Sequence, residues 1–140
     1  MIASAEQWLV EHTPAVVAAL GGSFTRCGVD GEDLGWVDGT FTPAALAGGP
    51  GGIVPGGVLA VVLGAAMTVA VDVVAMADES SATVTAMTVA VARSPRCAEP
   101  LTLRGEVTAL ERIGSSAEAT LADADGVLVA RATATLSRRR

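Results

Sequence analysis

An uncharged stretch, residues 39–71, decides the fold of this chain. Its centre reads Gly48-Gly49-Pro50-Gly51-Gly52-Ile53-Val54-Pro55-Gly56-Gly57, followed directly by Val58-Leu59-Ala60-Val61-Val62-Leu63-Gly64-Ala65-Ala66-Met67. Glycine and proline favour a loop, and the apolar run after them predicts a buried helix from Gly56 to about Ala75. The first N–H groups of a helix lack a partner within it and lie at the positive end of its dipole. The stretch therefore predicts a helix start that can hold a carbonyl oxygen or a phosphate.

The apolar run is too short to predict a membrane span. Only the 14 residues 58–71 separate the glycine loop from Asp72, whereas a helix that crosses a bilayer needs about 20 apolar residues. We therefore expect a core helix and no membrane partner.

The residues before this stretch predict a helix and a hairpin. Apolar side chains recur at helical spacing over residues 4–20, and Gly21-Gly22 follows as a stop, so residues 1–21 form an N-terminal helical segment. Pro14 either kinks this helix or splits it in two. Residues 23–29 and 35–42 read as strands on either side of a turn, Asp30-Gly31-Glu32-Asp33.

The residues after an acidic turn at 78–81 alternate with period two, which predicts strands. Four strands are expected over residues 83–91, 101–109, 115–122 and 127–136, with a hairpin turn at Asp123-Ala124-Asp125-Gly126 and a basic tail at 137–140. The 140 residues therefore predict a single α+β domain, 1–140. Its six-stranded antiparallel sheet would wrap around the long helix and bury it on every side.

Composition limits the class of function. The chain has no lysine and a net charge of −6, which argues against binding nucleic acid. One histidine, together with Cys27 and Cys97 outside any CxxC spacing, predicts neither a metal nor another cofactor. The first residues lack the pattern of a signal peptide, so we expect a cytoplasmic protein. A core of alanine and valine buries little area per residue, so we also expect an oligomer.

The predicted order of elements resembles the hot-dog fold, and specifically the PaaI-like acyl-CoA thioesterases. The resemblance rests on Trp36-Val37-Asp38-Gly39 as a second strand, Gly56-Gly57-Val58-Leu59-Ala60 as the helix start and Gly126-Val127-Leu128-Val129-Ala130-Arg131-Ala132-Thr133 as the closing strand. It implies a homodimer or homotetramer whose sheets join edge to edge and whose acyl-CoA site lies at the subunit boundary.

The resemblance also implies which residues form the site. The amides of Gly56 and Gly57 would hold the thioester oxygen, and Thr68 would position water. The family often places a His before the two glycines, an Asp or Glu seven positions after the second, and an Asn or Gln in the preceding loop. This chain has Pro55, Gly64 and Gly49 at these positions.

Arg93 and Arg96 lie where relatives carry basic residues that meet the coenzyme A phosphates; the alternative is that both are solvated surface charges. We therefore expect an acyl-CoA thioesterase-like protein without the usual carboxylate. The competing hypothesis is a non-catalytic subunit that binds an acyl ligand, because small residues at Gly49 and Gly64 would widen a tunnel beside the helix. Asp72, Asp38, Glu32 and Ser80 or Ser81 are the candidates to replace the missing carboxylate.

Overall fold

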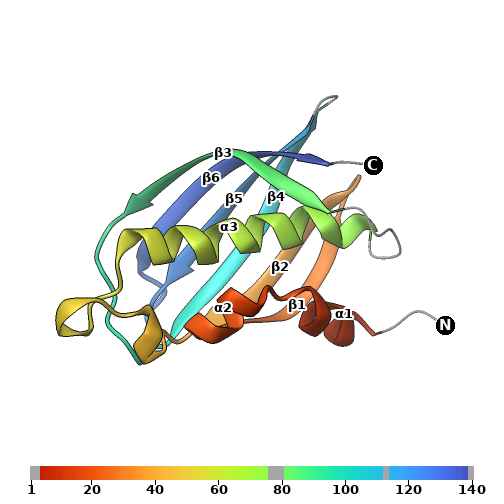
Figure 1. The fold of residues 1–140 in the computed structure, drawn as a ribbon. Helices are drawn as coiled ribbons and strands as arrows, with labels where there is room; N and C mark the ends of the chain where they lie inside the picture. The colour runs from red at the N-terminus through yellow and green to blue at the C-terminus, as the bar shows by residue number, and fades with distance from the viewer. Residues whose placement is uncertain (1–3, 76–80, 112–113, 139–140) are drawn as a thin grey trace.

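The computed structural model describes residues 4–75, 81–111 and 114–138, in which an antiparallel six-stranded sheet curves around one long helix, α3 (Figure 1). The strands lie in the order β1-β2-β4-β5-β6-β3, so β1 and β3 are the edges. This is the α+β hot-dog arrangement that the sequence predicted. The elements are α1 (Ala5–His12), α2 (Ala15–Leu20), β1 (Gly22–Asp30), β2 (Leu34–Phe41), η1 (Ala45–Ala47), η2 (Pro50–Gly52), α3 (Gly56–Asp72), η3 (Val73–Ala75), β3 (Ala82–Val91), β4 (Leu101–Glu111), β5 (Gly114–Ala122) and β6 (Leu128–Arg138).

Pro14 splits the predicted N-terminal helix into α1 and α2. The side chain of Ser4 caps α1 by accepting a hydrogen bond from the Gln7 amide at 3.1 Å. Pro14 restricts the backbone of Thr13 to an extended conformation, so the chain turns before α2 begins. Gly21, with a φ of 107°, ends α2. Both helices lie beside β1, at the edge of the sheet opposite β3 (Figure 1).

The C-terminal strand is longer than predicted. β6 continues through Arg138, because Ser137 and Arg138 pair with Thr83 and Ala82 of β3. Two residues of the predicted basic tail therefore belong to the sheet. The rest of that tail and, apart from Ser81, the predicted acidic turn at 78–81 lie outside the described residues.

Two glycines of the sheet allow the backbone of α3 to come unusually close. A Cβ atom added at Gly105 of β4 would lie 2.5 Å from the carbonyl oxygen of Ala66, and one added at Gly35 of β2 would lie 2.1 Å from that of Ala70. Ala66 and Ala70 are one turn apart, so they lie on the same face of α3. At these two points the sheet therefore contacts the helix through backbone atoms, a close approach that only glycine at positions 35 and 105 allows.

The prediction that the sheet buries α3 on every side is wrong for one face. Val61 is 42% exposed, Gly57 is exposed, and Gly64 and Thr68 are half-buried, all at helical spacing. These four residues form the open stripe of α3. It borders the edge strand β3, since a Cβ added at Gly64 would lie 3.6 Å from Sδ of Met87. The sheet ends at β3, so no further strand covers the stripe.

The close approach at Gly105 leads to a prediction for stability. We expect Gly105→Ala to lower the free energy of unfolding by about 1–3 kcal/mol, because the new methyl group would displace the backbone of α3. Gly64→Ala is the matched control: its Cβ meets only ordinary contacts, and alanine favours a helix, so stability should stay or rise. Urea denaturation of both variants provides the measurement. Equal midpoints would contradict the close packing.

Candidate functional site

The glycine loop before α3 is an ordered turn. The Gly49 amide donates to the carbonyl of Ile53 at 2.8 Å, and the Gly52 amide donates to that of Gly49 at 3.1 Å. Gly51 and Gly52 have φ values of 72° and 73°, which glycine adopts without strain. The residue predicted as a ligand-binding position, Gly49, therefore serves this turn through its backbone.

The connection between β3 and β4 holds the glycine loop from the side. The Val54 amide donates to Pro95 at 2.9 Å, and the Cys97 amide donates to Gly52 at 2.8 Å. Ile53 and Arg96 form an antiparallel bridge between these two hydrogen bonds. The loop and residues 95–97 thus form a short two-stranded unit that leads directly into Pro55 and α3.

The first turn of α3 presents two glycine amides to solvent. Pro55 is the N-cap, and its carbonyl accepts hydrogen bonds from the amides of Val58 and Leu59 at 3.1 and 3.3 Å. The N–H groups of Gly56 and Gly57 come earlier, so α3 has no carbonyl one turn before them to accept these bonds. Both glycines are exposed. The helix start can therefore donate two hydrogen bonds to an incoming oxygen at the positive end of the dipole.

The other two predicted positions on α3 lie further along the open stripe. The Thr68 hydroxyl donates to the carbonyl of Gly64 at 3.0 Å. Its oxygen keeps lone pairs that can accept a hydrogen bond from water, but its proton is engaged. Gly64 faces the thioether of Met87. The wall beside the stripe is therefore uncharged and largely apolar.

A single copy of the chain does not bring these groups to one point. A helix rises about 1.5 Å per residue, which places Gly64 about 10 Å and Thr68 about 16 Å along the axis from Gly57. A carbonyl held at Gly57 cannot also contact water held at Thr68 of the same helix. The two halves of the predicted site can meet only if a second helix runs beside the first in the opposite direction.

The residues predicted as replacements for the missing carboxylate lie elsewhere in the chain. Asp72 ends α3, about 22 Å along the axis from Gly57, and its Oδ1 accepts a hydrogen bond from the Ala82 amide at 2.9 Å. Asp38 is on the sheet face away from α3, where it pairs with Arg104 at 2.8 Å. Glu32 is in the turn between β1 and β2. Ser81 lies just before β3, where its hydroxyl donates to the carbonyl of Ala82, and Ser80 lies outside the described residues.

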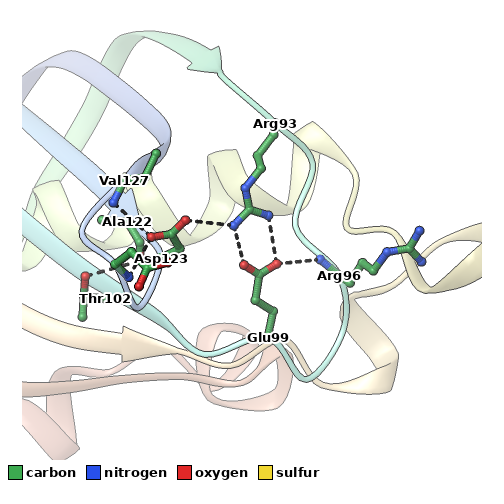
Figure 2. Close-up of polar contacts among 8 residues, drawn as sticks. Arg93, Arg96, Glu99, Thr102, Ala122, Asp123 and Val127 are labelled. Carbon is green, nitrogen blue, oxygen red and sulfur yellow. Dashed lines mark hydrogen bonds and ion pairs between the residues drawn. The ribbon is translucent and has the colours of Figure 1, made fainter.

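Arg93 and Arg96 have different environments, as Figure 2 shows. The Arg93 guanidinium binds both oxygens of Glu99, with Nη1 3.0 Å from Oε1, and Nη2 lies 3.4 Å from Oδ2 of Asp123. We call Arg93, Glu99 and Asp123 the Arg93 cluster. The Arg96 guanidinium instead donates to the carbonyl of Gly51 at 3.3 Å. Arg96 thus keeps a charge beside the glycine loop, while the charge of Arg93 is balanced by two carboxylates.

The Arg93 cluster shifts the pKa values of its members. The hydrogen bond to Glu99 raises the pKa of Arg93, and the same bond lowers the pKa of Glu99 below its ordinary value of 4.5. Hydrogen bonds from the Val127 and Asp125 amides, followed by Arg93, lower the pKa of Asp123. All three groups are thus stabilised in their charged forms. Their side chains are 41%, 26% and 19% exposed, so solvent screens this interaction.

Glu99, Asp123 and Met87 are neighbours of the site that sequence reasoning did not identify. Asp123 was predicted only as a turn residue, and that role is confirmed, since its Oδ1 accepts hydrogen bonds from Asp125 and Val127. Glu99 follows Arg93 by six residues within one short connection, and this nearness was the available signal for their ion pair. Met87 lies on the α3-facing side of β3 in the period-two pattern, which was the available signal for a wall of the stripe.

The described residues show no three His, Cys, Asp or Glu side chains grouped closely enough to bind a metal ion. Within the same part of the chain, no helix has the length and apolar character needed to span a membrane.

Solved structures share this fold across nearly the whole chain. A thioesterase from Haemophilus influenzae is 18% identical with a TM-score of 0.79, and the match covers 100% of this chain and 93% of that one. The E. coli PaaI protein, from the phenylacetic acid degradation operon, is 18% identical with a TM-score of 0.72 over 94% and 93% of the two chains. A candidate thioesterase from Ralstonia eutropha, described as phenylacetic acid degradation-related, is 27% identical with a TM-score of 0.73 over 89% and 90%.

No family model matches the sequence, and no curated protein sequence is significantly similar to it. The structural matches nevertheless define the class: this chain has the hot-dog fold of thioesterase-superfamily proteins. Among them are proteins of the PaaI type, the group that the sequence pattern resembled.

The pKa shifts of the Arg93 cluster lead to a prediction for pH. Because the pKa of Glu99 is lowered in the folded state, the stabilisation is present above its ordinary value of 4.5 and is lost as pH falls through the lowered value. We expect Arg93→Gln to move the titration midpoint of the Glu99 carboxyl upward, measured by carbon-detected NMR. Arg131→Gln, which breaks a separate ion pair with Glu118, should leave it in place. An unchanged midpoint in Arg93→Gln would contradict the pairing.

Proposed function

We propose that this protein binds an acyl-CoA-type thioester between two copies of the chain and hydrolyses it slowly. The observation that carries this proposal is the helix start at Gly56 and Gly57, which offers two exposed amides beside an uncharged, largely apolar stripe. A thioester combines a carbonyl oxygen, which accepts from amides, with an acyl chain that prefers an apolar wall. The thioesterases among the structural matches add support for this chemistry.

The character of the edge strand β3 favours pairing with a second copy of the chain. Its ten residues, Ala82–Val91, carry no charge and no proline, and most are exposed. A long, uncharged edge strand with unpaired backbone groups is a template for pairing with another strand. Pairing with β3 of a second copy would also cover the open stripe, and it would give a homodimer that could pair further into a homotetramer.

The proposed mechanism divides the work between the two helices. The N–H groups of Gly56 and Gly57 donate to the thioester oxygen and stabilise the charge that develops on it, a contribution worth about 3 kcal/mol per donor in other enzymes. A water hydrogen-bonded to Thr68 of the second copy attacks the carbonyl carbon. The C–S bond then breaks, giving a carboxylic acid and a thiol. Arg96, beside the glycine loop, is placed to meet a phosphate of the coenzyme.

The second candidate function is binding without hydrolysis. It is favoured by the described residues of the open stripe and its wall, among which no side chain can act as a general base at neutral pH. General base help typically contributes about 10²- to 10⁴-fold to a rate, so a site without it is slow or inactive. The same amides and apolar wall would then hold the ligand intact.

The first prediction from the proposed function concerns the interface between two copies. We expect Met87→Arg to shift the protein toward monomer, because the interface would bury an unpaired charge beside Gly64. Sedimentation velocity at several concentrations gives the measurement. Val10→Arg is the control, since Val10 is 73% exposed on α1, which contacts β1 at the opposite edge of the sheet from β3. A wild-type monomer, or equal masses for both variants, would rule out the β3 interface.

The second prediction concerns the oxyanion donors. We expect Gly57→Pro, which removes one N–H from the first turn, to lower kcat/KM by about 100-fold on aliphatic and aromatic acyl-CoA substrates. Thiol release measures the rate, and circular dichroism checks that the helix is retained. Unchanged turnover in a folded variant would show that this amide does not hold the oxygen.

The third prediction separates the two candidate functions. Gly64→Asp places a carboxylate on the open stripe, and we expect it to raise turnover about tenfold or more if water is the nucleophile. Gly64→Asn is the matched control, since it has the same size without the charge. A wild type that binds acyl-CoA but releases no thiol would favour the binding protein over the enzyme.

A further inference from the structure

Resting on the proposed function, we propose that Arg93 and Glu99 are positioning residues that hold the glycine loop, and with it the Gly56 and Gly57 amides, in the geometry that receives the thioester oxygen. Neither side chain needs to touch the ligand. They would act through residues 95–97, the segment that supports the loop. This assigns Arg93 a role different from the phosphate contact that the family resemblance implied.

The contacts form a continuous path from Arg93 to the helix start. Arg93 binds Glu99 through two nitrogens, and the same carboxylate accepts a hydrogen bond from the Arg96 amide at 3.3 Å (Figure 2). Arg96 bridges to Ile53 in the glycine loop, flanked by the Val54–Pro95 and Cys97–Gly52 hydrogen bonds. Pro55 and the two glycines follow Val54 directly in the chain.

A second anchor fixes the outer end of the path. Asp123 lies 3.4 Å from Arg93 and is itself held by the amides of Asp125 and Val127 in the turn before β6. Close by, the Ala92 amide donates to the carbonyl of Val129 at 2.8 Å. Arg93 therefore ties the connection between β3 and β4 to a hydrogen-bonded turn of the sheet.

The balance of charge favours positioning over phosphate binding for Arg93. Its guanidinium has two carboxylates as neighbours, so an arriving phosphate would have to displace one of them and would meet the charge of the other. Arg96 has no such requirement, because its guanidinium donates to a neutral carbonyl, that of Gly51. The two arginines thus have different roles, since Arg93 supports the loop and Arg96 remains able to meet a ligand.

The test is a double-mutant cycle with Arg93→Gln and Glu99→Gln, read on the complete protein by two measurements. The first is NMR hydrogen exchange of the Val54 and Cys97 amides, whose bonds join the loop to its support. The second is affinity for a carba analogue of octanoyl-CoA, which keeps the carbonyl and cannot be hydrolysed. We expect each variant to speed exchange by about tenfold and weaken affinity by about threefold to tenfold.

The double variant should be no worse than either single variant, because both remove the same contact. Arg93→Lys, which keeps the charge but loses the paired geometry, should recover part of the affinity. Arg131→Gln and Glu118→Gln break a comparable exposed ion pair between β6 and β5. These two variants should change neither the exchange rates nor the affinity.

The outcomes separate this proposal from the proposed function. Exchange rates in Arg93→Gln equal to those of Arg131→Gln would overturn the role in holding the loop. Faster exchange with unchanged affinity would overturn the role in positioning the amides. A wild type that does not bind the analogue would refute the proposed function and the positioning role together. Faster exchange in Arg93→Gln would in that case still support the role of Arg93 in holding the glycine loop.

Discussion

The backbone contact between α3 and the sheet at Gly35 and Gly105 is the constraint on which the rest of the structure depends. Carbonyl groups one turn apart on α3 lie where side chains of these two glycines would be, so the helix sits closer to the sheet than large residues would permit. At these contacts α3 presents the small residues Ala66 and Ala70, while Met67 and other larger side chains fill the neighbouring core. Small residues at these positions are thus a condition of this packing.

The same contact determines where the molecule is left open. A sheet held close along one line covers the helix on both sides only as far as its strands extend, and it ends at β3. The open stripe at Gly57, Val61, Gly64 and Thr68 follows from that limit. The glycine loop then fixes the start of the helix at the end of this stripe. Packing alone therefore places the amide donors at the start of α3 next to the apolar wall of the open stripe.

The local sequence pattern predicted most of the fold. It did not predict features that depend on residues far apart in the sequence or on a second copy of the chain. Period-two alternation and turn residues gave every strand, and the glycine loop gave the start of α3. The pattern could not show that Val61 is exposed, because the sequence of a helix face is equally apolar whether a sheet or a second copy covers it. It also could not show the contact of Arg93 with Asp123, since the two are 30 residues apart and are brought close only by the turn before β6. The sequence pattern therefore indicated the backbone donors of the candidate site and not the charge pairs near it.

The distribution of charge indicates what kind of ligand suits the helix start. Neither the glycine loop nor the open stripe carries a charged side chain, so attraction at Gly56 and Gly57 comes from two N–H dipoles and the helix dipole. Such a site stabilises a carbonyl oxygen most when negative charge develops on it in an apolar, water-poor setting. A free phosphate or carboxylate would lose its hydration against the apolar wall without gaining a cation. The arrangement therefore suits the thioester carbonyl proposed for the helix start, with any phosphate of its carrier proposed to lie further out, at Arg96.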